Sequence, residues 1–473
     1  MTPMDPSLSI TLDRAAGHSL ATQIHDAILA AIHDGTLAAG ARLPSWRDLA
    51  AQLGVARGTV RAAYDRLTDE QMIVGLGAAG TRVAAQPPLA ARTGAVAENS
   101  PLPAFFRDFE TAPLPFQMGV PAQDAFPFTQ WSRLVARAGR AAAAVPVSYP
   151  DPRGLPQLRR EIAAYLALAR GIACTPGQVI VTAGFAGALN LAIRALRLEG
   201  ARAWLEDPGF PLTRAALELA GIAPLPVPVD EEGIDVAEGR RRHPGATLAV
   251  VTPGQQAPLG VTLSLARRLA LLEWAGTNGA WIIEDDYLGE LQLRGRAAPA
   301  LASLDQGGRV LHIGTFSKTI TPGLRLGFLV VPPALAEHFG TAAACLSPAP
   351  APVIQRAVAD FIAEGHFLRH LRRMKRLYAA RREGLLATLH GLAPPGCVVR
   401  PGGLAVMLDL AEGADDVDIA RRAVLRGQSP VPLSPWRTGS APRPGLLLGV
   451  TNLEAGRIEE HCVRLLALID QHI

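Results

Sequence analysis

Apolar residues recur with a helical period near the start of the chain. Four aliphatic side chains stand at intervals of four residues: Leu20, Ile24, Ile28 and Ile32. This spacing predicts an amphipathic helix over residues 19–34, which Gly35 ends. Two further helices are predicted at 45–52 and 57–70, separated by the turn at 53–55. Ser45 can cap the first of these two helices, with Asp48 as its capping-box partner.

The pattern changes after the third helix. Gly75, Gly77 and Gly80 punctuate a short hairpin that ends in the strand 81–83. Helix, tight turn, helix and hairpin make up the winged helix-turn-helix plan, in which the second helix of the pair enters the major groove of DNA. The inner face of that helix is predicted to hold Val60, Ala63, Tyr64 and Leu67.

A further change in pattern divides the chain. Residues 85–115 are rich in proline and alanine, a composition typical of an extended linker. From about residue 116 onward, apolar strands alternate with amphipathic helices, which predicts an α/β domain with a mostly parallel sheet. We therefore expect a mostly α-helical domain at 1–84, a linker, and an α/β domain at 116–473 with a smaller α+β subdomain from about 345.

Composition narrows the class of protein. The chain is 49% hydrophobic and 19% charged, which excludes a largely disordered chain, and its 473 residues predict about two to four domains. No apolar run is long enough to cross a membrane, and the N-terminus lacks a signal-peptide pattern, so we expect a cytoplasmic protein. The four cysteines have no CxxC spacing, so we expect no metal site and no disulfide framework.

The charge of the chain gives only a weak indication of its partners. The net charge is +4, and of 46 basic residues only Lys318 and Lys375 are lysines. Residues 1–85 contain seven arginines against eight acidic residues, so any DNA binding there depends on where the cations lie rather than on bulk charge.

Five residues are the candidate DNA contacts: Ser45, Arg47, Arg57, Thr59 and Arg61. The first two begin the leading helix of the pair, where backbone amides can hold a phosphate. The other three begin the second helix, where side chains reach bases and phosphates. The pattern alone leaves open a small structural bundle with solvated arginines.

The residues of this region carry a resemblance. The stretch GTLAAGARLPSWRDLAAQLGVARGTVRAAYDRL, followed by GLGAAGTRV, resembles the winged helix-turn-helix domain of GntR-type bacterial regulators. The resemblance implies binding to double-stranded promoter DNA. Trp46 and Ala56 stand where that family usually has small hydroxyl residues, and Ala56 leaves its helix without a side-chain cap, a loss of about 1 kcal/mol.

Candidate chemistry lies at the ends of two predicted strands. The acidic run Glu284-Asp285-Asp286 and Tyr287 follow the strand 281–283, and Lys318 follows the strand 309–313. Ligands of such sheets sit at the carboxyl ends of the strands. Taken singly, the lysine could be solvated and the acids could cap a helix. Together they suit pyridoxal phosphate (PLP), whose aldehyde reacts with a lysine amine and whose ring nitrogen pairs with a carboxylate.

These segments resemble a second family. IGTFSKTITPGLRLGFLVV and WIIEDDYLGEL are similar to the lysine and aspartate segments of fold-type I PLP enzymes, the aspartate aminotransferase superfamily. The resemblance implies that Lys318 is the Schiff-base and catalytic lysine, that Asp285 pairs with the pyridine nitrogen, and that Tyr287 contacts the phenolic oxygen. It further implies cofactor contacts from Arg325, Thr315 and Gly184 to the phosphate, from Phe210 to the ring, and from Tyr149 to the phosphate of a partner subunit.

The two resemblances together are typical of MocR-type regulators, which join a GntR-type head to an aminotransferase-like body. That family implies a homodimer, arranged head to tail, whose heads read two half-sites while the body senses PLP or an amino compound. Such a protein would be cytoplasmic and associated with the nucleoid.

Departures from the aminotransferase pattern bear on the effector. Leu447 stands where family members that recognise amino acids usually carry an arginine for the α-carboxylate, and Arg443 is out of place for that role. In TPGQQAPLG, Ala257 and Leu259 replace larger or polar groups. We therefore expect an effector that lacks this carboxylate, an effector that uses another arginine such as Arg214 or Arg437, or PLP itself.

Two alternatives to a PLP-responsive transcription factor remain open. One is a working aminotransferase with a regulatory or vestigial DNA-binding head, against which the missing arginine weighs. The other is a DNA-binding scaffold that no longer loads PLP. The intact set of Lys318, Asp285, Tyr287 and Arg325 argues against that scaffold.

Overall fold

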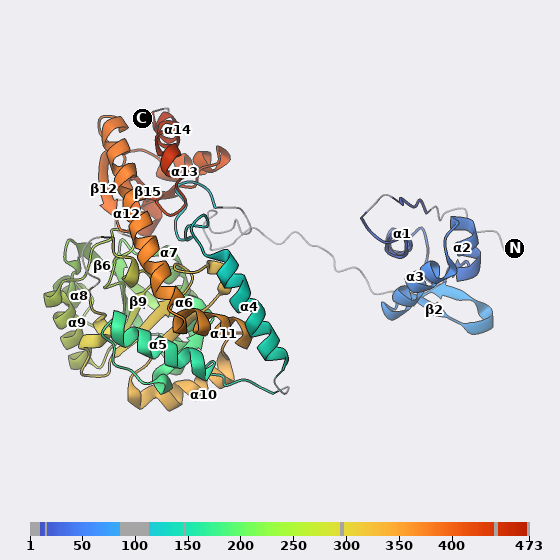
Figure 1. Ribbon diagram of the computed structural model, residues 1–473, viewed down its shortest axis with the longest axis horizontal. Helices are drawn as coiled ribbons and strands as arrows, with labels where there is room; N and C mark the ends of the chain where they lie inside the picture. The colour runs from blue at the N-terminus through green and yellow to red at the C-terminus, as the bar shows by residue number, and fades with distance from the viewer. Residues whose placement is uncertain are drawn as a thin grey trace. The chain divides into compact units, whose positions relative to one another are not determined.

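The computed structural model forms two compact units, Met1–Asn99 and Ser100–Ile473 (Figure 1). The structure describes residues 10–14, 17–85, 113–144, 148–293, 298–438 and 443–470. Most of the predicted proline-rich linker, residues 86–112, lies outside this described part.

The N-terminal unit contains the three predicted helices and the predicted hairpin. Its helices are α1 (Leu20–His33), α2 (Trp46–Leu53) and α3 (Arg57–Asp69). Its strands are β1 (Arg42–Leu43), β2 (Ile73–Gly75) and β3 (Thr81–Val83), in the antiparallel order β1-β3-β2. The winged helix-turn-helix prediction is therefore confirmed.

The core of this unit follows the predicted apolar positions. Ile24 and Ile28 of α1 are fully buried, and so are Val60 and Leu67 on the inner face of α3. The hydroxyl group of Tyr64 donates a 2.9 Å hydrogen bond to the carbonyl oxygen of Pro44, which fixes α3 against the start of α2. These contacts hold the outer face of α3 toward solvent.

The C-terminal unit is built on an eight-stranded sheet in the order β4-β11-β10-β9-β8-β5-β6-β7. The strands are β4 (Val179–Thr182), β5 (Arg202–Asp207), β6 (Ala223–Asp230), β7 (Gly233–Ile234), β8 (Leu248–Val251), β9 (Trp281–Asp286), β10 (Val310–Thr315) and β11 (Gly327–Val330). The five strands from β10 to β6 are parallel, whereas β11 pairs antiparallel with both of its neighbours and β7 with β6. This confirms the mostly parallel sheet.

Two predicted strands end later than expected. The sequence predicts that these strands end at Ile283 and Ile313. In the structure β9 continues to Asp286 and β10 to Thr315, and Gly314 of β10 pairs with Asp286. Polar residues are poor predictors of a strand end here because the folded chain buries them and supplies partners, so the backbone pairing continues.

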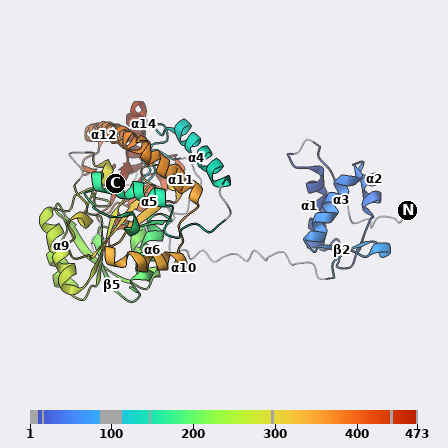
Figure 2. The same ribbon diagram turned by 60° about the horizontal axis from the view of Figure 1, so that its bottom comes forward.

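Helices cover both faces of this sheet. The helices of the unit's larger part are α4 (Phe128–Ala143), α5 (Pro156–Ala169), α6 (Gly184–Ala195), α7 (Pro211–Leu219), α8 (Val236–Arg242), α9 (Leu265–Asn278), α10 (Ala336–Leu346) and α11 (Pro352–Ala363). On one face, α6 and α10 pack against each other and share a core with alternate residues of β9, β10 and β11 (Figure 2). On the other face, α8 and α9 cover the β8–β9 side, and α5 and α11 cover the β4–β11 side.

A smaller α+β part follows, as predicted. Its antiparallel sheet has the order β12-β13-β15-β14, from strands β12 (Val398–Gly402), β13 (Ala405–Asp409), β14 (Val431–Pro432) and β15 (Gly445–Gly449). Helices α13 (Asp416–Leu425) and α14 (Ile458–Ile469) belong to it. The long helix α12 (His366–Leu392) contacts α11 at one end and α14 at the other, so it connects both parts (Figure 1). Among the described helices, none combines the length and apolarity needed to cross a bilayer.

Candidate functional site

The predicted lysine and aspartate meet at the edge of the sheet. Strands β9 and β10 are parallel neighbours, with Asp285 paired to Ile313. Since side chains alternate along a strand, Asp285 lies on the face of Ile283, whose side chain packs into the core beneath α6. Thr315 shares this face two residues beyond Ile313, and Lys318 follows in the next turn.

Burial makes both groups unusual. Burial, with the charge of Asp286 adding to it, raises the pKa of Asp285 to about 8, while the Lys318 cation opposes the rise. Burial also lowers the pKa of Lys318, and the cation of Arg325 adds to that shift. The Oδ1 atom of Asp285 is buried and has no hydrogen-bond donor. Lysine and carboxylate therefore lie within electrostatic range of each other, the carboxylate buried and the lysine half-buried.

An anion could be held beside them. Gly184 begins α6 with a φ of +74°, and a Cβ added to Gly327 would lie 3.0 Å from the Cα of Gly184. The two glycines therefore let the start of the helix lie close to the sheet. The hydroxyl group of Thr315 accepts a 3.1 Å hydrogen bond from the Ser317 amide. Arg325 is exposed at the end of the turn Pro322–Leu324. Helix N-terminal amides and an arginine form a suitable receptor for a phosphate.

Two predicted aromatic residues lie by a common apolar cluster. Phe210 and Tyr287 both pack against buried residues that include Leu447 and Trp436. The ring centroids of Phe210 and Trp436 are 5.5 Å apart. Burial raises the pKa of Tyr287 well above its usual value, with Asp285 adding to the shift, so its hydroxyl group stays protonated.

Tyr149 is the exception among the predicted cofactor contacts. Its side chain is fully exposed on the single chain, and the structure does not bring it to the other site residues. A role for Tyr149 toward a partner subunit stays a prediction.

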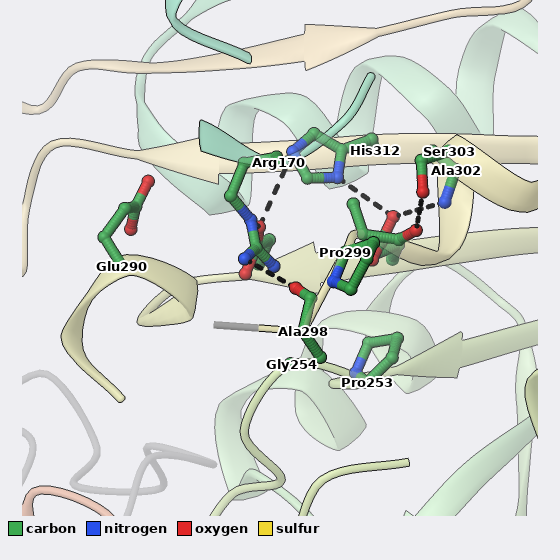
Figure 3. A network of polar contacts seen from close by, with 12 residues as sticks. Arg170, Pro253, Gly254, Glu290, Ala298, Pro299, Ala302, Ser303 and His312 are labelled. Atoms are coloured by element: carbon green, nitrogen blue, oxygen red, sulfur yellow. Dashed lines mark hydrogen bonds and ion pairs between the residues drawn. The ribbon is translucent and has the colours of Figure 1, made fainter. Parts of the chain in front are cut away.

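A buried polar network underlies the site on the opposite face of β9 (Figure 3). Nε of Arg170 lies 2.6 Å from Oδ2 of Asp286, and Nδ1 of His312 lies 3.0 Å from Oε2 of Glu284. Glu284 also accepts hydrogen bonds from the backbone amides of residues 301 and 302. Burial opposes a charge on His312, but Glu284 outweighs it and raises the pKa of the imidazole. The sequence analysis did not predict this network. The acidic residues on either side of Asp285 were the one sequence signal that could have indicated it.

A second buried acid was also missed. Glu206, at the end of β5, accepts hydrogen bonds of 2.5 Å from the Thr252 hydroxyl group and 3.1 Å from the Thr252 amide. Burial raises the pKa of Glu206 to about 7. Its charge acts on both Asp285 and Tyr287, so it belongs to the electrostatics of the same pocket.

The candidate DNA contacts lie on the surface of the N-terminal unit. Arg57 and Arg61 are exposed at the start of α3, and Thr59 is half-exposed. Nε of Arg61 lies 3.8 Å from Oδ2 of Asp65, and both side chains are largely in solvent. Such an exposed pair constrains Arg61 only weakly.

The start of α2 adds two more of these residues. The hydroxyl group of Ser45 accepts from the Asp48 amide, which confirms its role as a cap. It also donates to Asp48 Oδ2 at 2.7 Å, so the acid contacts the hydroxyl group rather than completing a reciprocal capping box through the Ser45 amide. The guanidinium group of Arg47 lies 4.8 Å from the centroid of the Trp46 ring.

The sequence pattern did not single out Arg42 of β1 or Arg82 of β3. The two residues are backbone partners where these antiparallel strands pair. Ala56 precedes α3 without a side-chain cap, as expected.

Within the described ranges, no group of three or more His, Cys, Asp or Glu side chains could hold a metal ion.

Comparison with known proteins connects both units to families. Residues 20–83 match the bacterial regulatory proteins of the gntR family, and residues 122–445 match the aminotransferases of class I and II. The probable rhizopine catabolism regulatory protein MocR of Rhizobium meliloti is 37% identical over 465 residues, which are 95% of this chain and 94% of that protein.

Two further similarities are informative. The HTH-type pyridoxine biosynthesis transcriptional regulator PdxR of Corynebacterium glutamicum is 34% identical, over 93% of this chain and 94% of that protein. Among solved structures, the α-aminoadipate aminotransferase LysN of Thermus thermophilus, complexed with N-(5'-phosphopyridoxyl)-L-leucine, has a TM-score of 0.68 at 27% identity. It is matched over 76% of this chain and 92% of its own.

Proposed function

Because the chain belongs to the MocR-type regulators, with a GntR-type DNA-binding domain before an aminotransferase class I and II domain, we propose specific roles for its residues. The chain is a PLP-dependent transcriptional regulator. Its N-terminal unit is a DNA-binding domain, and PLP is the cofactor of its C-terminal unit.

The pocket fits PLP. The buried Oδ1 of Asp285 lacks a donor, and this single observation carries the assignment, since a protonated ring nitrogen would supply one. Lys318 would hold the aldehyde carbon, and its lowered pKa favours the neutral, nucleophilic amine. Arg325, Thr315 and the Gly184 end of α6 would hold the phosphate, with Tyr287 and Phe210 against the ring.

The chemistry that PLP supplies when bound is an aldehyde that condenses reversibly with primary amines. The residues of the chain orient it and exclude water. Asp285 favours a proton on the ring nitrogen, the buried Tyr287 keeps its hydroxyl proton as a donor, and Gly119 accepts a 3.0 Å hydrogen bond from Nζ of Lys318. We infer that an amino compound, or PLP itself, is the signal.

The test uses the full-length protein and its two lysines. After incubation with PLP, borohydride reduction and mass mapping should place a pyridoxyl group on Lys318. Lys375→Ala should be labelled as the wild type is, whereas Lys318→Ala should lose the chromophore. Unlabelled wild-type protein would overturn the cofactor assignment and favour a PLP-independent scaffold.

We further propose that the regulator is a head-to-tail homodimer whose two heads bind two half-sites. The full exposure of Tyr149 on a single chain supports a role across a subunit interface. Sustained transamination of ordinary amino acids is not the proposed activity, because Leu447 removes the usual carboxylate receptor. Steady turnover with a common amino acid and keto acid would favour the enzyme instead.

A further inference from the structure

A tryptophan and an arginine are in ring contact at the start of α2. The guanidinium carbon of Arg47 lies 4.8 Å from the centroid of the Trp46 ring. At this distance the face of an indole attracts an arginine through a cation–π interaction. Consecutive residues of a helix do not normally face each other, so the contact requires the Arg47 side chain to turn back over the ring.

Trp46 is anchored on the core of the N-terminal unit. Its side chain is half-buried and packs against the buried cluster that includes Leu43 of β1 and Leu49 of α2. Arg47 is exposed, and a freely rotating arginine loses conformational entropy when it binds a partner. A ring fixed on the core restricts the stacked guanidinium group in advance, which lowers this entropic cost of binding.

No carboxylate in the described part of the chain occupies Arg47. The side chain has neither a hydrogen bond nor an ion pair there, and the neighbouring Asp48 accepts a 2.7 Å hydrogen bond from the Ser45 hydroxyl group. Arg66 of α3, by contrast, lies 2.9 Å from Glu70. Stacking on an indole leaves the in-plane N–H groups of a guanidinium free to donate. Arg47 therefore presents an unpaired set of donors.

These donors belong to a helix end that attracts anions. Trp46 and Arg47 are the first two residues of α2, so their backbone amides have no partner within the helix. The amide of Asp48 is already satisfied, because it donates a 3.2 Å hydrogen bond to the Ser45 hydroxyl group. A phosphate group can accept hydrogen bonds both from amides at a helix N-terminus and from an arginine.

We propose that Trp46 is a positioning residue for DNA binding, whose ring holds the guanidinium group of Arg47 ready for a phosphate of the DNA backbone. This inference rests on the function proposed above, in which the N-terminal unit binds DNA. Because a tryptophan is unusual at this position of a GntR-type sequence, the arrangement is a property of this chain. The ring acts through Arg47, so its contribution to affinity depends on the presence of that arginine.

A double-mutant cycle on the full-length protein tests this dependence. The probe is a labelled DNA duplex that the wild-type protein selects from a library of random sequences. Leucine keeps apolar packing but removes the ring, so Trp46→Leu should weaken binding about two- to fivefold while Arg47 is present. The same change should have no effect in the Arg47→Gln protein. Arg47→Gln itself should weaken binding and reduce the slope of log affinity against log salt concentration by about 0.9.

Two further variants separate the ring from its packing. Trp46→Phe keeps an aromatic face and should recover most of the affinity that Trp46→Leu loses. Leu29→Ala trims another half-buried side chain packed on the same core, so it is the control and should leave binding unchanged.

Three outcomes would overturn the inference. They are an equal loss from Trp46→Leu with and without Arg47, no loss from Trp46→Leu in the wild-type background, and an Arg47→Gln protein that binds as the wild type does. A wild-type protein that selects no duplex would instead overturn the function proposed above.

Discussion

Nζ of Lys318 donates a 3.0 Å hydrogen bond to the carbonyl oxygen of Gly119, 199 residues earlier in the chain. Gly119 lies in the first segment of the C-terminal unit. This segment is tied to the smaller part of the unit, because Val120 accepts hydrogen bonds from Thr451 and Asn452. The lysine proposed to hold PLP therefore contacts the stretch of chain that enters the body.

Gly119→Ala should disturb this contact. Gly119 has a φ of +80°, and an added Cβ would lie 2.8 Å from Nζ of Lys318. The left-handed backbone alone costs about 1–2 kcal/mol with a side chain, and the contact would displace the lysine amine. We expect weaker PLP binding in an absorbance titration. Gly139→Ala, whose added Cβ meets nothing within 4 Å, is the control, and equal PLP affinities of the two variants would exclude a role for this contact.

Asp285 should make the stability of the cofactor-free protein depend on pH. Its folded-state pKa, about 8, lies above the unfolded value near 4, so between these values the folded chain binds more protons than the unfolded chain. Stability from this group is therefore lost as pH rises from about 4 to 8. Asp285→Asn removes the effect, so the gain in unfolding free energy over wild type should grow from pH 5 to pH 8.

Urea unfolding of cofactor-free protein at several pH values measures this difference. The pKa of Glu206 is raised in the same direction, but Glu206 is present in both proteins, so the difference between them reports chiefly the titration of Asp285 and its interaction with Glu206. A gain that is constant with pH would contradict the raised pKa of Asp285. Added PLP should flatten the wild-type profile, since the ring nitrogen would pair with the ionised carboxylate.

Arg170→Met should destabilise the body strongly. Arg170 and Asp286 form an ion pair at 2.6 Å with both side chains almost fully buried, and removal of one partner leaves an uncompensated buried charge. Such changes cost about 3–5 kcal/mol. Urea unfolding followed through the tryptophans of the body gives the value.

Arg421→Met provides the comparison for that variant. Arg421 pairs with Asp418 within α13, and its side chain is 74% exposed. Loss of an exposed pair of this kind costs less than about 1 kcal/mol. Similar losses for the two variants would show that the buried pair contributes no more than a surface pair.

Arg61→Ala should weaken binding to the operator by about 1–3 kcal/mol if Arg61 reads a base. Asp65→Ala is the matched control, because it removes the acid 3.8 Å from Arg61 and keeps the arginine. A gel-shift or anisotropy titration at fixed salt concentration gives both affinities. An operator affinity unchanged by Arg61→Ala would remove Arg61 from the contact surface.

The limits of the sequence are clearest at two places. The acids that follow Ile283 suggest the end of a strand, yet β9 continues to Asp286 because Arg170 and the β10 backbone provide partners from distant positions. Glu206 had no local pattern to distinguish it from a surface acid, and only its burial beside Thr252 shows its place in the pocket. In both cases the deciding contacts are long-range.

The sequence by itself determined the two-unit plan, the helices of the head, the mostly parallel sheet, and the placement of Lys318 and Asp285 on adjacent strand ends. Those features depend on local periodicity, and parallel strands bring their carboxyl ends to one edge. Only the tertiary structure decided which side chains share the pocket. The apolar cluster around Leu447 and the buried Oδ1 of Asp285 depend on burial, which arises when distant segments pack together.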